Sequence, residues 1–314
     1  MSTMKIVFFG TSSFAANILC FLLEKKIDVC AIVTQTDKKT GKRVHVSPVK
    51  DVALSKPQIK LFQPEKATDE GFISEIKDLK PDLFVVVAYG KILRPKLLDV
   101  PKVDSINVHA SLLPKYRGAD PIRRCIMEGE KETGISIMKM VAEMDAGDII
   151  EMEKIPISID DNFEIVEKKL CQTAKELLLS VLHQFEKKTV KYKPQDHTKA
   201  TFANKLTKEE MEISWNQSAL HIHNLIRALS PYPGATCDIY INGEKKRLKI
   251  LESEIIKKQA PFGEIISFEN DTWIVGCKEN CIKILSSQLE GKKRLSTGEF
   301  IRGIKGKVSF HSSI

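Results

Sequence analysis

Short, nearly continuous apolar runs alternate with amphipathic segments in the first third of the chain. The runs over 5–10 and 29–34 are typical of strands that are buried on both faces, and the apolar spacing over 14–25 predicts a helix between them. A strand, a helix and a second buried strand predict a right-handed crossover, and therefore a parallel sheet. Two more buried strands are predicted over 81–90 and 105–109.

The pattern changes after a long amphipathic helix predicted over 163–185. The polar stretch that follows contains Pro194 and has no apolar periodicity, so we expect a linker there. Short alternating segments, which predict a small antiparallel barrel, then recur at 235–241, 248–256, 263–268, 272–277 and 282–289. We therefore expect one domain over 1–187, a linker over 188–205 and a second domain over 206–314.

Composition and charge narrow the class of protein. Hydrophobic residues make up 42% of the chain and charged residues 29%, which is usual for a soluble globular protein. Since no apolar run is long enough to cross a bilayer or to form a signal sequence, we expect a cytoplasmic protein without membrane contact. The net charge of +8 fits either a lysine-rich surface or a polyanionic partner. Charge alone favours the first.

Several kinds of site are excluded by the motifs. The seven cysteines are odd in number and include no CxxC pair, which argues against a disulfide framework and a structural zinc site, so no metal is expected. Gly10 stands without the rest of a dinucleotide-binding fingerprint. The chain also has no P-loop and no Gly-x-Ser-x-Gly elbow.

Two polar side chains interrupt the predicted strand over 105–109. Asn107 and His109 are two residues apart, so in a strand both project from the same face. A Ser-Leu-Leu-Pro turn follows directly. An amide beside an imidazole at the end of a strand can polarise a carbonyl group and handle a proton. Each residue alone also has an ordinary structural explanation, and it is their pairing that favours a site.

Asp145 is a candidate partner for this pair. It precedes Ala146 and Gly147 in a turn, which is most often a purely structural place for an aspartate. Near His109, its carboxylate would favour the charged imidazole and hold its tautomer. The three residues would then form an acyl-transfer site without a covalent nucleophile, but spacing alone does not place Asp145 near His109.

The loop over 35–50 is strongly basic. Asp37 is its one acid, and Gly41 marks it as flexible; its basic residues are Lys38, Lys39, Lys42, Arg43 and Lys50. It is either a solvated surface loop or a contact for phosphate groups at the ligand-binding edge of the sheet.

Residues 107–118, with Asp145 in its Met-Asp-Ala-Gly-Asp turn, resemble the signature of the formyltransferases that use 10-formyltetrahydrofolate. The likeness covers nearly the whole chain; other similar segments are 9–11, 14–16, 35–50, 86–90, 205–210, 213–215 and 226–228. The signature is shared by members that act on glycinamide ribonucleotide and on sugar nucleotides. The motifs after residue 204 are more similar to those of members that act on methionyl-tRNA.

This resemblance implies an α/β N-terminal domain with a Rossmann-like parallel sheet and a C-terminal OB-like β-barrel. It implies that Asn107, His109 and Asp145 are catalytic. Folate-binding residues by the same likeness are Ser111, Leu112, Leu113, Pro114, Val87, Ala88 and Tyr89. The amine of initiator methionyl-tRNA would attack the formyl carbon, in the service of translation initiation. Neither DNA nor a metal is expected as a partner, and a monomer is expected.

The resemblance also implies where tRNA is bound. The basic loop would contact the acceptor stem through Lys38, Lys39, Lys42 and Arg43. The barrel would add phosphate contacts through Lys245, Lys246, Arg247, Lys292, Lys293 and Arg294. Each of these residues is equally compatible with a solvated surface position.

Two other functions remain open. A sugar-nucleotide formyltransferase would have the same signature but would need no basic loop. A non-catalytic RNA-binding module with a relic site would be expected to have lost Asn107, His109 or Asp145, and all three are present.

Overall fold

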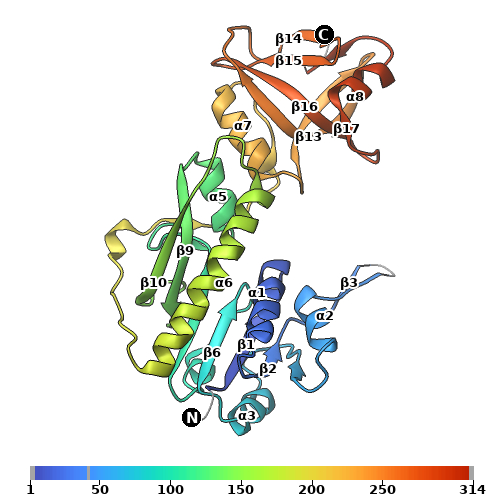
Figure 1. Cartoon of the computed structure of the whole chain (residues 1–314). Helices are drawn as coiled ribbons and strands as arrows, with labels where there is room; N and C mark the ends of the chain where they lie inside the picture. Colours follow the sequence, from blue (N-terminus) through green and yellow to red (C-terminus); the bar gives the residue numbers. More distant parts are fainter. Residues whose placement is uncertain (1–3, 41–42, 311–314) are drawn as a thin grey trace. The chain divides into compact units, whose positions relative to one another are not determined.

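The computed structural model describes residues 4–40 and 43–310, and its contacts divide the chain into two compact units (Figure 1). The first unit comprises the residues up to Pro121 together with Glu132–Ile155 and Glu167–Ala203. The second comprises Ile122–Lys131, Pro156–Val166 and the chain from Asn204 onward. Most of the predicted linker therefore packs as part of the first unit.

The described residues of the first unit form a seven-stranded sheet in the order β10-β9-β7-β6-β1-β2-β5. Its strands are β1 (Ile6–Gly10), β2 (Val29–Val33), β5 (Lys60–Phe62), β6 (Leu83–Val87), β7 (Asp104–His109), β9 (Glu132–Lys139) and β10 (Ile149–Pro156). The pairings from β5 to β7 are parallel, as predicted. β9 runs antiparallel to β7, which the sequence pattern did not predict.

Helices flank this sheet: α1 (Ser13–Glu24), α2 (Pro48–Leu54), α3 (Glu70–Asp78), α4 (Pro95–Leu98) and α6 (Phe163–Lys187). The first turn of α6 belongs to the second unit. Ser12 caps the N-terminus of α1, where its hydroxyl accepts a hydrogen bond from the Ala15 N–H, and the helix buries Ile18, Leu19 and Leu22 completely. The predicted helices over 14–25 and 163–185 are confirmed. The two-stranded pair of β8 (Arg117–Gly118) and β11 (Phe202–Ala203) completes the first unit.

The segment 35–50, which the sequence predicted as one flexible basic loop, contains secondary structure. It includes a hairpin of β3 (Lys38–Thr40) and β4 (Arg43–His45) and the first residues of α2, which the sequence pattern did not predict. The strands of this hairpin are short and polar and have no apolar alternation, which is the feature that identifies a strand in sequence. Gly41 and Lys42 lie outside the described residues.

The second unit contains an antiparallel, barrel-like sheet in the order β14-β15-β16-β13-β12-β18, with β17 paired to β16. Its strands are β12 (Ala235–Ile241), β13 (Glu244–Ile256), β14 (Ile265–Glu269), β15 (Thr272–Gly276), β16 (Cys281–Leu289), β17 (Leu295–Ser296) and β18 (Val308–Ser309). Its helices are α5 (Pro121–Met127), α7 (Ala219–Ala228) and α8 (Thr297–Gly303). The predicted strands are confirmed. Trp273 is fully buried at the centre and stacks on Phe300, with ring centroids 4.9 Å apart.

All seven cysteines are free thiols. Within 4–40 and 43–310, no cluster of three or more His, Cys, Asp or Glu side chains is arranged to hold a metal ion. No helix in the described part of the chain is long and apolar enough to cross a membrane.

Candidate active site

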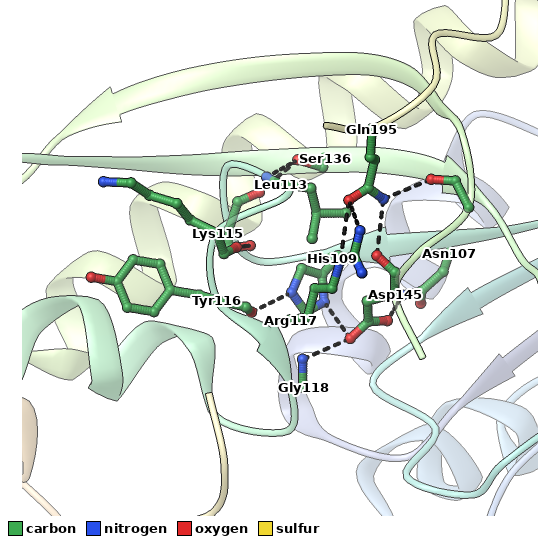
Figure 2. A network of polar contacts seen from close by, with 12 residues as sticks. Asn107, His109, Leu113, Lys115, Tyr116, Arg117, Gly118, Ser136, Asp145 and Gln195 are labelled. Atoms are coloured by element: carbon green, nitrogen blue, oxygen red, sulfur yellow. Dashed lines mark hydrogen bonds and ion pairs between the residues drawn. The ribbon is translucent and has the colours of Figure 1, made fainter. Parts of the chain in front are cut away.

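Asn107 and His109 lie near the carboxyl end of β7, between β6 and β9 (Figure 2). Asn107 is half-buried, and the His109 side chain is 6% exposed. Strand positions so enclosed are normally apolar, as Ile106 and Val108 are in the same strand. Two polar groups in this place need polar partners, and the turn after β9 supplies one.

Asp145 lies in that turn and joins the pair. Its Oδ1 accepts a long hydrogen bond of 3.4 Å from Asn107 Nδ2, and its Oδ2 is 3.7 Å from His109 Nδ1. Oδ2 also accepts a hydrogen bond of 2.8 Å from the Gly118 N–H. The structure therefore brings together the three residues that the sequence singled out, including the one that spacing could not place.

The backbone of this turn is unusual. Asp145 has a φ of +52°, in the left-handed region that side chains other than glycine rarely adopt. Two residues later, a Cβ on Gly147 would lie 1.9 Å from the Lys139 carbonyl oxygen, so only glycine fits there. Packing against β9 thus requires glycine at position 147, in the same turn that places the Asp145 carboxylate next to β7.

The second nitrogen of His109 has a different partner. Nε2 lies 2.9 Å from the Tyr116 carbonyl oxygen. Because a carbonyl oxygen only accepts, Nε2 carries a proton in this contact, while Nδ1 faces the Asp145 carboxylate, which is also an acceptor. Both ring nitrogens therefore lie next to acceptors, and the Tyr116 carbonyl orients the ring together with Asp145.

The expected folate loop, residues 111–114, is held by its own polar groups. Ser111 is fully buried, and its hydroxyl donates to the Lys115 carbonyl over 2.7 Å. Ser136 Oγ donates to the Ser111 carbonyl and accepts from the Leu113 N–H. Ser111 thus holds the loop in shape through hydrogen bonds within it. Leu113 is buried, whereas Leu112 and Pro114 are half-buried.

The other expected folate segment, Val87 to Tyr89, begins where β6 ends. Val87 pairs with Val108 in register, so the two segments start at the same edge of the sheet. Ala88 is exposed and has a φ of +43°. The Tyr89 carbonyl accepts hydrogen bonds from Thr11 Oγ1 and Gln35 Nε2, and burial raises the pKa of the Tyr89 phenol to about 12.

Arg117 and Gln195 lie next to the catalytic candidates, and neither was identified as a functional residue from the sequence. Arg117 is 2% exposed, and its guanidinium donates to Gln195 Oε1 over 2.8 Å and to His197 Nδ1 over 3.0 Å. Its third neighbour is the exposed carboxylate of Glu143, 3.5 Å away. Gln195 is also buried and reaches the Asp145 turn (Figure 2). Arg117 lies inside the signature segment, whereas Gln195 lies in a polar stretch with no distinguishing pattern.

The basic residues expected to bind tRNA lie on separate elements. Lys38 and Lys39 are in β3 and Arg43 is in β4, and Lys38 is exposed. At the foot of the hairpin, Lys50 Nζ is 2.7 Å from Asp37 Oδ2. Hydrogen bonds from Lys50 and Gln63 lower the pKa of Asp37.

In the second unit, Lys292 and Lys293 are exposed. The other four expected cations have acidic neighbours: Lys245 and Arg247 pair with Asp238, Lys246 with Glu244, and Arg294 with Glu252. The acidic neighbours reduce the positive charge around four of the six basic residues that were expected to contact phosphates.

Comparisons with known proteins match both units. The family model described as "Formyl transferase" matches residues 4–182, and "Formyl transferase, C-terminal domain" matches residues 205–305. The chain is 44% identical over 312 residues to the methionyl-tRNA formyltransferase of Protochlamydia amoebophila, which covers 98% of each chain. It is also 44% identical to the protein of that name from Kosmotoga olearia, over 92% of this chain and 93% of the relative.

Solved structures show the same fold at lower identity. HypX from Aquifex aeolicus, in complex with tetrahydrofolic acid, superimposes with a TM-score of 0.66 at 18% identity, over 98% of this chain and 49% of that one. WlaRD, a sugar 3N-formyl transferase, gives a TM-score of 0.67 at 20% identity, over 93% of this chain and 100% of that one.

Proposed function

The chain belongs to the formyl transferase family, and from this premise we propose that it transfers the formyl group of 10-formyltetrahydrofolate to the free amino group of initiator methionyl-tRNA. One observation carries the chemical part of the proposal: the Asp145 carboxylate lies against both Asn107 and His109 at the carboxyl end of β7. The names of relatives that match over nearly their whole length support the acceptor.

The residues at this edge of the sheet fit a folate. The turns after β6 and β7 begin side by side, and they offer exposed backbone at Ala88 and apolar surface at Leu112 and Pro114. A flat ring with polar edges needs this combination of backbone groups and apolar surface. The tetrahydrofolic acid named in the HypX complex supports the same assignment.

The co-substrate supplies a formyl carbon bonded to N10. Asn107 and His109 stabilise the negative charge that develops on the formyl oxygen while the amine attacks. The Asn107 amide has a second hydrogen besides the one it gives to Asp145, and it donates that hydrogen to the oxygen. His109 does the same through Nε2 once the formyl oxygen replaces the Tyr116 carbonyl as its acceptor.

Asp145 manages the proton. The attacking amine forms the new N–C bond and must lose one proton, while the leaving N10 must gain one as its bond to the formyl carbon breaks. We assign Asp145 as the group that accepts this proton through an intervening water and returns it by the same route. No covalent intermediate on the protein is needed.

Recognition of tRNA is assigned to the cations outside this site. Lys38, Lys39, Lys42 and Arg43 of the basic segment 35–50 would contact the acceptor stem, and exposed lysines of the second unit would contact backbone phosphates. In this proposal residues 1–187 carry the chemistry, 188–205 connect, and 206–314 bind tRNA. The protein acts as a monomer in the cytoplasm, and its product serves translation initiation.

The acceptor is tested directly with purified protein and 10-formyltetrahydrofolate. Methionyl-tRNA and a nucleotide-linked amino sugar are offered separately and then together. We expect methionyl-tRNA to be formylated in both reactions that contain it, and the sugar to remain unformylated in both reactions that contain the sugar. Formylation of the sugar, without that of methionyl-tRNA, would replace this proposal with sugar-nucleotide formyl transfer.

A further inference from the structure

The segment that leaves α6 is fastened along the first unit. We call residues 191–203 the strap. The Tyr192 hydroxyl donates to Asp104 Oδ2 over 2.6 Å, and Lys193 exchanges two backbone hydrogen bonds of 2.8 Å with Ile149. Further along, Thr201 Oγ1 accepts from the Tyr116 N–H over 2.9 Å. The strap is therefore fixed on both sides of Gln195.

The Gln195 side chain is 6% exposed and uses both ends of its amide (Figure 2). Nε2 donates to the Asp145 carbonyl over 2.9 Å and to the Gly147 carbonyl over 2.6 Å. Oε1 accepts from Arg117 Nη2 over 2.8 Å and from Nε over 3.3 Å. Two donors and two acceptor sites are the full capacity of a primary amide.

These contacts join the two turns that orient the Asp145 carboxylate. The donor end holds the backbone of Asp145 itself, at the residue with the left-handed φ of +52°. The acceptor end holds Arg117, whose neighbour Gly118 gives its N–H to Asp145 Oδ2. A residue in a sparsely populated backbone region persists only where its surroundings over-determine it, and Gln195 is one of these surroundings.

We propose that Gln195 is a positioning residue for formyl transfer: from the strap, it clamps the Asp145 turn onto Arg117 and so holds the Asp145 carboxylate against Asn107 and His109. This inference rests on the proposed function. Gln195 acts through Asp145 and does not touch the reacting atoms. Through Gln195, the strap supports the Asp145 turn as well as connecting the two units in sequence.

Gln195→Glu separates this role from simple support of Arg117. A carboxylate still accepts from the buried guanidinium, so Arg117 keeps its partner, but it has no N–H for the carbonyls of Asp145 and Gly147. Gln195→Met removes both interactions. Tyr192→Phe is the matched control, because it loosens the same strap at Asp104 and leaves the Asp145 turn untouched.

We expect Gln195→Glu to lower kcat about 100-fold while the KM values for both substrates change less than about threefold, since a small misplacement of a catalytic group has this effect. Gln195→Met should show a similar or larger loss, and Tyr192→Phe should keep kcat within about twofold. If Gln195→Glu keeps the parent kcat, Gln195 serves only to pair Arg117 and the inference is wrong.

Hydrogen exchange of the Gly118 amide tests the same clamp without any acceptor. This N–H is bonded to Asp145 Oδ2, and it should exchange at least about tenfold faster in Gln195→Glu than in the parent or in Tyr192→Phe. An unchanged rate would overturn the inference even if the parent formylates methionyl-tRNA. A parent that does not formylate methionyl-tRNA would instead reject the proposed function, and the exchange rates would still decide the role of Gln195.

Discussion

The main-chain N–H of Gly118 donates a 2.8 Å hydrogen bond to Asp145 Oδ2, the same oxygen that lies 3.7 Å from His109 Nδ1. The other carboxylate oxygen accepts from Asn107. Both oxygens of Asp145 therefore face donors, and the residue is oriented as an acceptor on two sides.

Asp145→Asn should lower kcat by about 100- to 10,000-fold, the usual contribution of a positioned acid or base. An amide has only one acceptor oxygen, so either Asn107 or Gly118 would meet an N–H instead of an oxygen. Steady-state kinetics with both substrates measures this, with Asp148→Asn, the other acid of the same turn, as control. Equal activity of the two variants would remove Asp145 from the mechanism.

Gly147→Ala should destabilise the protein by about 2 kcal/mol or more, because the added Cβ would lie 1.9 Å from the Lys139 carbonyl oxygen and force β9 and the turn apart. Urea unfolding measures the loss. Gly243→Ala is a useful comparison, since Gly243 also lies in a turn but its Cβ position is open, so that only its φ of +80° opposes the change. A smaller effect at Gly147 than at Gly243 would contradict the packing argument.

The sequence predicted most strands well because burial leaves a direct apolar signal. Asn107 and His109 were recognisable since they break that signal within one strand, and the i, i+2 spacing placed both on one face. Strand direction leaves no such signal, which is why the antiparallel β9 was not predicted. Asp145 depends on a turn whose conformation follows from Gly147 packing against β9.

Gln195 shows more clearly what could not be predicted from the sequence. A single glutamine in a polar stretch between two domains looks like a linker residue, and its contacts with Asp145, Gly147 and Arg117 span 48 to 78 positions of sequence. Only the folded chain brings these groups together. The basic hairpin was missed for the opposite reason, because its local pairing involves no apolar alternation.

The second unit should lose stability in mild acid because of His223. This side chain is 4% exposed and contacts Ser253 and the Ile159 carbonyl, and burial lowers its pKa below the ordinary value of 6.5. As the pH falls below about 6.5, the unfolded chain takes up the proton first, so the free energy of unfolding decreases until the folded-state pKa is reached.

Urea unfolding of the parent and of His223→Gln between pH 5 and pH 8 checks this. The parent should lose more stability than the variant on going below about pH 6.5, since glutamine does not titrate. The two curves running parallel across this range would show that His223 does not carry the effect.

Charge reversal at Lys42 and Arg43 should weaken tRNA binding and flatten its salt dependence, by about 1.5 to 2 in the slope of log K against log salt if both residues contact phosphates. Binding titrations at several salt concentrations measure the slope. The same double charge reversal at Lys77 and Lys80, which are exposed near the end of α3, is the control for net charge. Equal slopes for the two variants would show that Lys42 and Arg43 do not contact tRNA phosphates.

The most direct test of the central claim is a single-turnover measurement with the parent and His109→Ala. Each protein, in a separate reaction and in excess over methionyl-tRNA, is mixed with methionyl-tRNA and 10-formyltetrahydrofolate. The dissociation constant for each substrate is measured separately. We predict rapid formylation by the parent, and a loss of at least about 100-fold in His109→Ala with both dissociation constants within about threefold of the parent. A parent that leaves methionyl-tRNA unformylated, or a variant that formylates it at the parent rate, would contradict the account.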